Sequence, residues 1–166
     1  MKTTLIYAYV FAGVSLAACS HGQPPVSAAP AAWTIEPIRT ALKSGDSTTV
    51  RIDARLGSGW HIYSVTQPAG GPIATRISLP AGQPFVLAGD PAPTVPPHVA
   101  FDDAFHMSVK LHEKAVGFTV PVRMTGPLTG SDDSVHVRVR YQVCNASLCY
   151  PPQIARLATP VGTAGS

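Results

Sequence analysis

Charged and aromatic side chains are both scarce in this chain, and the scarcity of charge restricts its partners. Charged residues make up 13% of the 166 residues and aromatic residues 7%. The 12 Lys and Arg exceed the 9 Asp and Glu by three, and they are scattered with no basic run. Because nucleic-acid binding needs a clustered basic surface, nucleic acid is not an expected partner. The apolar fraction of 45% suffices for one folded domain.

After residue 32 no long stretch repeats its apolar residues with the 3.6-residue period of a helix. The chain's 17 Pro and 14 Gly indicate frequent turns. Apolar residues instead alternate with polar ones over 49–56, 116–124 and 135–142. Shorter strands are expected at 60–64, 73–79, 85–87, 107–111 and 154–157. This many short strands separated by turns predicts an all-β fold, an immunoglobulin-like antiparallel β-sandwich.

Two features of the central region modify the strand pattern. Pro121 lies inside the strand expected over 116–124, and because proline has no N–H to donate, it indicates an edge strand or a bulge. The proline-rich segment 88–104 shows no clear alternation. We therefore expect a long irregular connection there, of a kind that often carries function.

The N-terminus is typical of an export signal and not of a folded element. An apolar stretch over 5–17, too short for a typical spanning helix, leads into the sequence Leu-Ala-Ala-Cys that ends at Cys19. This ending resembles a bacterial lipobox, in which cleavage precedes the cysteine and its thiol is lipidated. The alternative is an ordinary secretory signal cleaved near Ala18. Both interpretations export the chain to an oxidising compartment, where disulfides persist.

Composition then suggests the domain boundaries. We expect a lipoprotein signal peptide over 1–18, a flexible Pro/Ala-rich tether over 19–32, the β-sandwich over 33–160 and a disordered tail over 161–166. A lipid anchor at Cys19 would hold the domain on the periplasmic side of a bacterial membrane. Ser20 after the lipidated cysteine favours the outer membrane over the inner one, by similarity to known sorting signals.

Lipidation of one cysteine leaves a single pair, Cys144 and Cys149, with four residues between them. The pair follows the strand expected over 135–142, and a proline pair ends the segment soon after Cys149. Such a stretch can turn back as a hairpin loop and bring its two cysteines within disulfide distance. A disulfide closing so short a loop adds only about 2 kcal/mol in the chain-entropy description.

The residues alone leave three interpretations of this pair open. It can be a redox site, because accessible and strained disulfides are the more easily reduced ones. It can be a structural disulfide in an exported interaction module. It can also hold copper or zinc if further ligands come from His61, His106 or His112.

The segment 141–152, with the pattern Y-Q-x-C-x4-C-Y-P-P, resembles the signature of the N-terminal periplasmic domain of the thiol:disulfide interchange protein DsbD. Weaker similarities lie at 59–64, 77–80, 101–105 and 120–122. The resemblance implies an immunoglobulin-like sandwich and a protein-disulfide reductase component that needs no cofactor. Its electrons would pass from a membrane-embedded thiol reductase to thioredoxin-like periplasmic proteins. Because these 166 residues hold no multi-span segment and no Cys-x-x-Cys motif, we expect the reductase to be a separate protein.

The same resemblance implies residue roles. Cys144 and Cys149 would form the redox disulfide, and Cys149 would form the mixed disulfide with partners. Phe105 would belong to a cap loop that shields the sulfurs, and Asp103 would lie near the start of that loop. The other residues expected to line the site are Tyr63, His61, which replaces an aromatic residue of the family, and Tyr150. Ordinary core packing is the alternative for Phe105 and Tyr63.

Overall fold

The computed structural model describes residues 30–128 and 133–162, and within these ranges every regular element is a β-strand. The strands are β1 (Ala31–Ile35), β2 (Ser47–Leu56), β3 (His61–Tyr63), β4 (Arg76–Ser78), β5 (Phe85–Leu87), β6 (Ala92–Pro93), β7 (His98–Asp102), β8 (Met107–Glu113), β9 (Ala115–Met124), β10 (Ser134–Tyr141), β11 (Val143–Cys144) and β12 (Gln153–Pro160). No helix in the described residues could cross a membrane. The expected signal peptide and Cys19 lie outside them.

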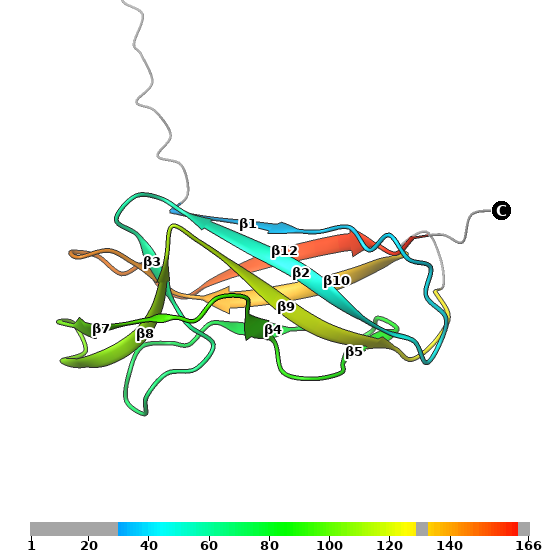
Figure 1. The fold of residues 1–166 in the computed structure, drawn as a ribbon, viewed down its shortest axis with the longest axis horizontal. Helices are drawn as coiled ribbons and strands as arrows, with labels where there is room; N and C mark the ends of the chain where they lie inside the picture. Colours follow the sequence, from blue (N-terminus) through cyan, green and yellow to red (C-terminus); the bar gives the residue numbers. More distant parts are fainter. Residues whose placement is uncertain (1–29, 129–132, 163–166) are drawn as a thin grey trace, which may run out of the picture.

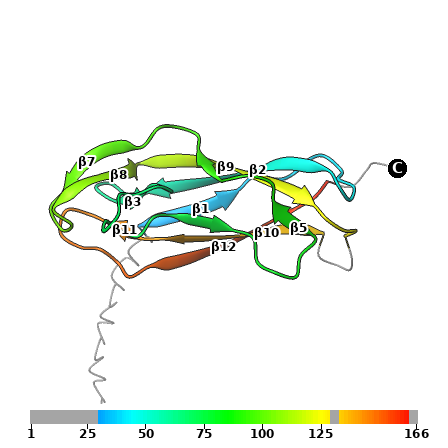
Figure 2. The ribbon, with the colours of Figure 1, turned by 90° about the horizontal axis from the view of Figure 1, so that it is seen from below.

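The strands form three antiparallel sheets (Figures 1 and 2). One sheet has the order β1-β2-β9-β5, with β6 also paired to β9; the second has the order β12-β10-β4. These two sheets lie one over the other, as Figure 2 shows for β9 and β10. The third sheet, β11-β3-β8-β7, lies at one end of the sandwich. The predicted immunoglobulin-like antiparallel β-sandwich is therefore confirmed.

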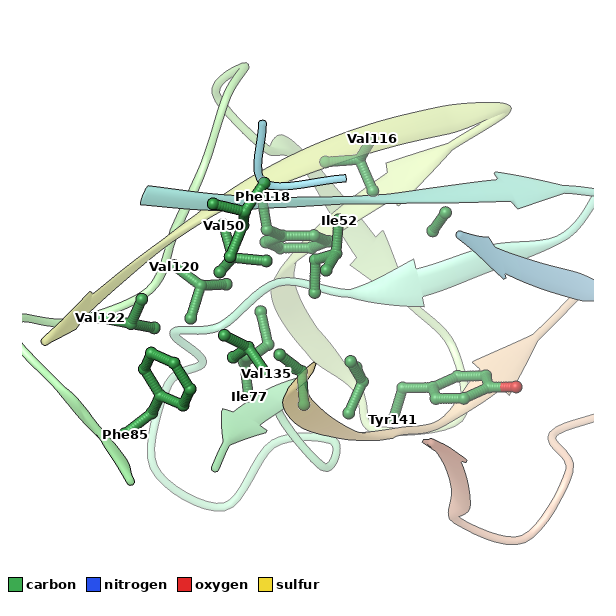
Figure 3. Close-up of a cluster of buried hydrophobic side chains, with 14 of the residues drawn as sticks. Val50, Ile52, Ile77, Phe85, Val116, Phe118, Val120, Val122, Val135 and Tyr141 are labelled. Atoms are coloured by element: carbon green, nitrogen blue, oxygen red, sulfur yellow. The ribbon is translucent and has the colours of Figure 1, made fainter. Parts of the chain in front are cut away.

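The core forms because the alternating strands turn their apolar residues inward. On β10 the residues Val135, Val137 and Val139 are buried while Arg138 and Arg140 are exposed. Figure 3 shows Val135 among the core side chains, on the side facing the opposite sheet. The labelled members are Val50, Ile52, Ile77, Phe85, Val116, Phe118, Val120, Val122, Val135 and Tyr141. The sandwich thus has its own apolar core, to which neither cysteine of the pair belongs.

The segment 88–104 is more regular than the sequence indicates. It contains β6 and β7, and β7 pairs with β8 over its whole length in a β-hairpin. The alternation is hard to see because β7 is an edge strand that exposes apolar side chains. Phe101 is 64% exposed and Val99 is 60% exposed. The expectation of an irregular connection was wrong for this part.

Pro121 lies in a central strand, so the expectation of an edge strand was also wrong. β9 is paired to β2 on one side and to β5 and β6 on the other. The carbonyl of Pro121 accepts a hydrogen bond from the N–H of Ala88, between the end of β5 and the start of β6. Proline is tolerated because its missing N–H lies where the neighbouring strand is interrupted.

The described domain extends past both boundaries expected from composition. β1 begins at Ala31, which is buried and pairs with Leu56, although this position falls in the expected tether. At the other end Val161 is buried, and its N–H donates to the carbonyl of Asp133. Small side chains at Ala31 and Ala32 resemble a linker in composition, but pairing with β2 holds them in the sheet.

Candidate functional site

The cysteine pair forms a disulfide at the tip of the loop after β10. Cys144 ends β11, and its sulfur is bonded to Cys149 with a Cα–Cα distance of 4.1 Å. Asn145 shapes the loop between them, because its Oδ1 accepts hydrogen bonds from the N–H groups of Ser147 and Leu148 at 2.9 and 2.8 Å. Asparagine is a typical residue for this kind of turn. The hairpin and the disulfide expected from the sequence are both present.

The two cysteines differ sharply in accessibility. Cys144 is 1% exposed and belongs to a small apolar cluster with Tyr63, Val109 and Leu111. Cys149 is only half-buried and lines a cleft of about 310 Å³. A molecule approaching from solvent therefore meets Cys149 first.

The sheet β11-β3-β8-β7 separates this site from the main core. Ile62 and Val143 pair directly and both face the main core. Since side chains alternate along a strand, their neighbours His61 and Cys144 lie on the opposite face. Tyr63, Leu111 and Val109 lie on that same outer face, where they form the apolar cluster beside the disulfide.

The turn between β7 and β8 covers this outer face. Phe105 packs against the cluster, and its ring meets the ring of Tyr63 edge-on with centroids 6.0 Å apart. Figures 1 and 2 both show the β7–β8 turn and the loop after β11 at the same end of the molecule. The structure thus places Tyr63 in the same small cluster as Cys144 and packs Phe105 against that cluster.

Asp102 fixes the turn that carries Phe105. One oxygen of its carboxylate accepts hydrogen bonds from the N–H groups of Ala104 at 2.9 Å and Phe105 at 3.3 Å. The other oxygen accepts a hydrogen bond from the Tyr63 hydroxyl at 2.8 Å. One side chain therefore joins the covering turn to the buried floor of the site.

The resemblance implies that Asp103, the next residue, is the acidic residue near the start of this loop. Asp103 is exposed at the edge of the cleft, and its carboxylate has no hydrogen bond or ion pair within residues 30–128 and 133–162. An aspartate that begins a turn and accepts from backbone N–H groups two and three residues on is a recognisable signal. With two adjacent aspartates, however, the sequence does not show which one begins the turn.

Burial changes the acid–base behaviour of the site. It raises the pKa of Tyr63, and the hydrogen bond to Asp102 and the charge of Asp102 raise it further. Tyr63 is therefore a neutral hydrogen-bond donor at physiological pH. Burial also lowers the pKa of His61, and this effect is opposed by the charges of Asp102 and Glu113. His61 lines the cleft together with Cys149.

Tyr150 stabilises the disulfide loop through contacts with Trp60 and Val143. Its ring packs on Trp60 with centroids 5.4 Å apart, and its N–H donates to the carbonyl of Val143. It is not one of the residues that line the described cleft. This position stabilises the chain where it leaves the disulfide loop.

Of the histidines considered as metal ligands, His61 lies beside the cysteines and His112 does not. His112 faces the main core, where its Nε2 lies 3.2 Å from the Ser64 hydroxyl, while His61 lies on the other face of the sheet. In the described part of the chain no group of three or more His, Cys, Asp or Glu side chains is arranged to hold a metal ion.

Comparison with known proteins gives two similarities. Residues 31–159 match the family described as thiol:disulfide interchange protein DsbD, N-terminal. The fold is similar to the crystal structure of the N-terminal periplasmic domain of ScsB from Proteus mirabilis, with a TM-score of 0.55 and 15% sequence identity. That similarity covers 79% of this chain and 46% of the other, so this chain spans about half of it. No curated protein matches the sequence.

Replacement of Asp102 should loosen the covering turn while the sandwich stays folded. Asp102→Ala removes three hydrogen bonds to a carboxylate, each worth about 1.5 kcal/mol or more when charge-assisted. We expect amide hydrogen exchange at Ala104 and Phe105 to accelerate at least about tenfold, as measured by NMR. Asp103→Ala is the matched control and should leave these rates unchanged. Equal effects of the two variants would contradict the conclusion that Asp102, and not Asp103, fixes the turn.

Proposed function

This chain belongs to the family of the N-terminal domain of the thiol:disulfide interchange protein DsbD, and from that premise we propose that it exchanges electrons with other proteins through Cys144 and Cys149. The observation that carries the proposal is the placement of the disulfide. Cys149 lines a cleft, Cys144 is buried, and Phe105 of the β7–β8 turn packs against the cluster that contains Cys144.

A purely structural role explains this placement less well. The disulfide closes a short hairpin loop that backbone hydrogen bonds already close, from Asn145 N–H to the Leu148 carbonyl and from Tyr150 N–H to the Val143 carbonyl. A disulfide over so few residues contributes only about 2 kcal/mol in the chain-entropy description. The main core, moreover, lies on the other face of the sheet.

The proposed reaction is thiol–disulfide exchange. In the reduced protein the Cys149 thiolate attacks one sulfur of a partner disulfide, and the other partner sulfur leaves as a thiolate. Cys144 then attacks Cys149 in the mixed disulfide and releases the second partner thiol. The partner gains two electrons and two protons, and this protein regains its internal disulfide. The greater accessibility of Cys149, which is half-buried and lines the cleft, supports its role as the attacking cysteine.

The partners and the location follow from the family and the N-terminal sequence. We propose thioredoxin-like periplasmic proteins as exchange partners and a membrane-embedded thiol reductase as the electron source. We also propose that a lipid on Cys19 holds the domain at the periplasmic side of a membrane, with the outer membrane favoured. The cap role of Phe105 belongs to the same proposal, because its ring packs over the cluster that holds Cys144.

Mixed-disulfide trapping separates the roles of the two cysteines. A Cys144→Ser variant keeps the accessible sulfur but cannot resolve the intermediate, so it should accumulate covalent complexes with proteins that contain Cys-x-x-Cys. A Cys149→Ser variant should accumulate far fewer, because Cys144 is buried. The complexes are measured after acid quenching by non-reducing electrophoresis and mass spectrometry. Capture at equal levels by both variants, or by neither, would overturn the roles.

Truncation of the covering ring should expose the reduced cysteines. Phe105→Ala removes about 1 kcal/mol of aromatic packing, so oxidation of the reduced pair by a small oxidant should become about fivefold faster. Val99→Ala, on the exposed face of β7, is the control and should have no effect. The rate is followed by the loss of free thiols. An unchanged rate in Phe105→Ala would remove the cap role.

The lipid anchor has its own test. With Cys19→Ala the protein should move from the membrane fraction to the soluble periplasmic fraction, because the thiol that carries the lipid is gone. Mass spectrometry of the wild-type N-terminal peptide should show an acylated Cys19. A free thiol at Cys19, or a variant that stays in the membrane fraction, would show that the anchor is absent.

A further inference from the structure

Three residues lie in one row across the sheet that carries the site. In the antiparallel register, Cys144 of β11 pairs with His61 of β3, and His61 pairs with Glu113 of β8. Directly opposed residues in antiparallel strands point to the same face, with Cβ atoms about 4.5–5.5 Å apart. The imidazole is therefore flanked by the disulfide on one side and by a carboxylate on the other.

Two residues of this row also reach the cleft. His61 and Glu113 line it together with Cys149, and the disulfide ties Cys149 to Cys144. The ring of His61 is held edge-on against Tyr63 with centroids 5.2 Å apart. Three separate strands and one loop thus direct a carboxylate, an imidazole and two sulfurs to one surface.

The Nε2 atom of His61 is buried and has no hydrogen-bond partner within residues 30–128 and 133–162. A buried nitrogen without a partner is unfavourable and calls for an explanation. The structure shows the oxidised pair, whose sulfurs carry no proton to donate. Reduction would create two S–H groups on the face that His61 occupies.

We propose that His61 accepts the proton of the attacking cysteine thiol, and that Glu113 positions the imidazole and stabilises its charged form. This inference rests on the proposed function. The proton of the Cys149 thiol passes to the neutral imidazole, and the Cys149 thiolate attacks the partner disulfide. The imidazolium then returns the proton to the leaving thiolate, so His61 ends the step neutral.

The electrostatic surroundings suit this role. The groups that face His61 are Glu113 from β8, Asp102 and Asp103 from the β7 end, Tyr63 on its own strand, and the two cysteines. Burial lowers the imidazole pKa, which keeps His61 neutral and able to accept a proton at pH 7. The carboxylates of Asp102 and Glu113 act in the opposite direction and stabilise the imidazolium once it forms.

The test is the pH dependence of thiol reactivity in the full chain. The protein is reduced, freed of reductant and mixed with excess 4,4′-dithiodipyridine, a small disulfide whose product absorbs light. Rates are measured from about pH 5 to about pH 10, which spans the ordinary pKa values of imidazole and thiol. His61→Gln should slow the reaction at least about tenfold near pH 7. The rates of the wild type and of His61→Gln should become equal above the thiol pKa, where the thiolate forms without a base.

Glu113→Gln supplies a second readout at an exposed position. Loss of this carboxylate lowers the His61 pKa further, so the low-pH inflection of the rate profile should move to lower pH, and it should vanish in His61→Gln. His136→Gln, on β10 in another sheet, is the matched histidine control and should keep the wild-type profile. The proton-acceptor role would be overturned if the ratio of the wild-type rate to the His61→Gln rate were the same at every pH. It would also be overturned if His61→Gln reacted as fast as the wild type.

Failure of this inference can be told apart from failure of the proposed function. If the reduced pair reacts with the disulfide probe but the profile shows only thiol titration in every variant, the exchange function stands and the role of His61 falls. If the native protein yields no reactive thiols after mild reduction, the proposed function itself falls.

Discussion

The register that pairs β11 with β3, and β3 with β8, is the constraint on which the whole site depends. It turns one face of this small sheet toward the main core and the other face toward the disulfide site. A slip of one residue would exchange the two faces: Cys144 would enter the apolar core and Val143 would take its place. Burial of Ile62 and Val143 in that core fixes the register strongly and thereby fixes the position of the sulfurs.

The covering turn depends on the same sheet through a single carboxylate. Asp102 accepts two backbone N–H groups of the turn and the hydroxyl of Tyr63, which is fully buried beside Cys144. Its hydrogen bonds are local and partly buried, whereas the sandwich is held by a large apolar core. The turn can therefore open with a free-energy change much smaller than that of global unfolding. Such a difference is what the proposed cap role of Phe105 requires.

The strands could be predicted from the sequence where apolar and polar residues alternate without a break. The strands over 116–124 and 135–142 were correctly expected, because each buries one face over many residues. β7 was missed because it is an edge strand with Val99 and Phe101 exposed. The cysteine hairpin was expected from the spacing of its cysteines, and the exchange function came from the resemblance. The row formed by Cys144, His61 and Glu113 could not be found, since their adjacency depends on strand pairing between distant segments. The roles implied for Phe105, Asp103 and Tyr150 remain predictions.

The reduction potential of the native domain tests the central claim most directly. The full chain is equilibrated with dithiol buffers of graded potential, and the fraction of free cysteine is measured beside a near-ultraviolet spectrum that reports packing. The account predicts a potential above about −300 mV, because structural disulfides of exported proteins lie below that value, with the sandwich still packed when the pair is reduced. A potential below that limit, or loss of packing together with the disulfide, would show that the bond is structural and contradict the account.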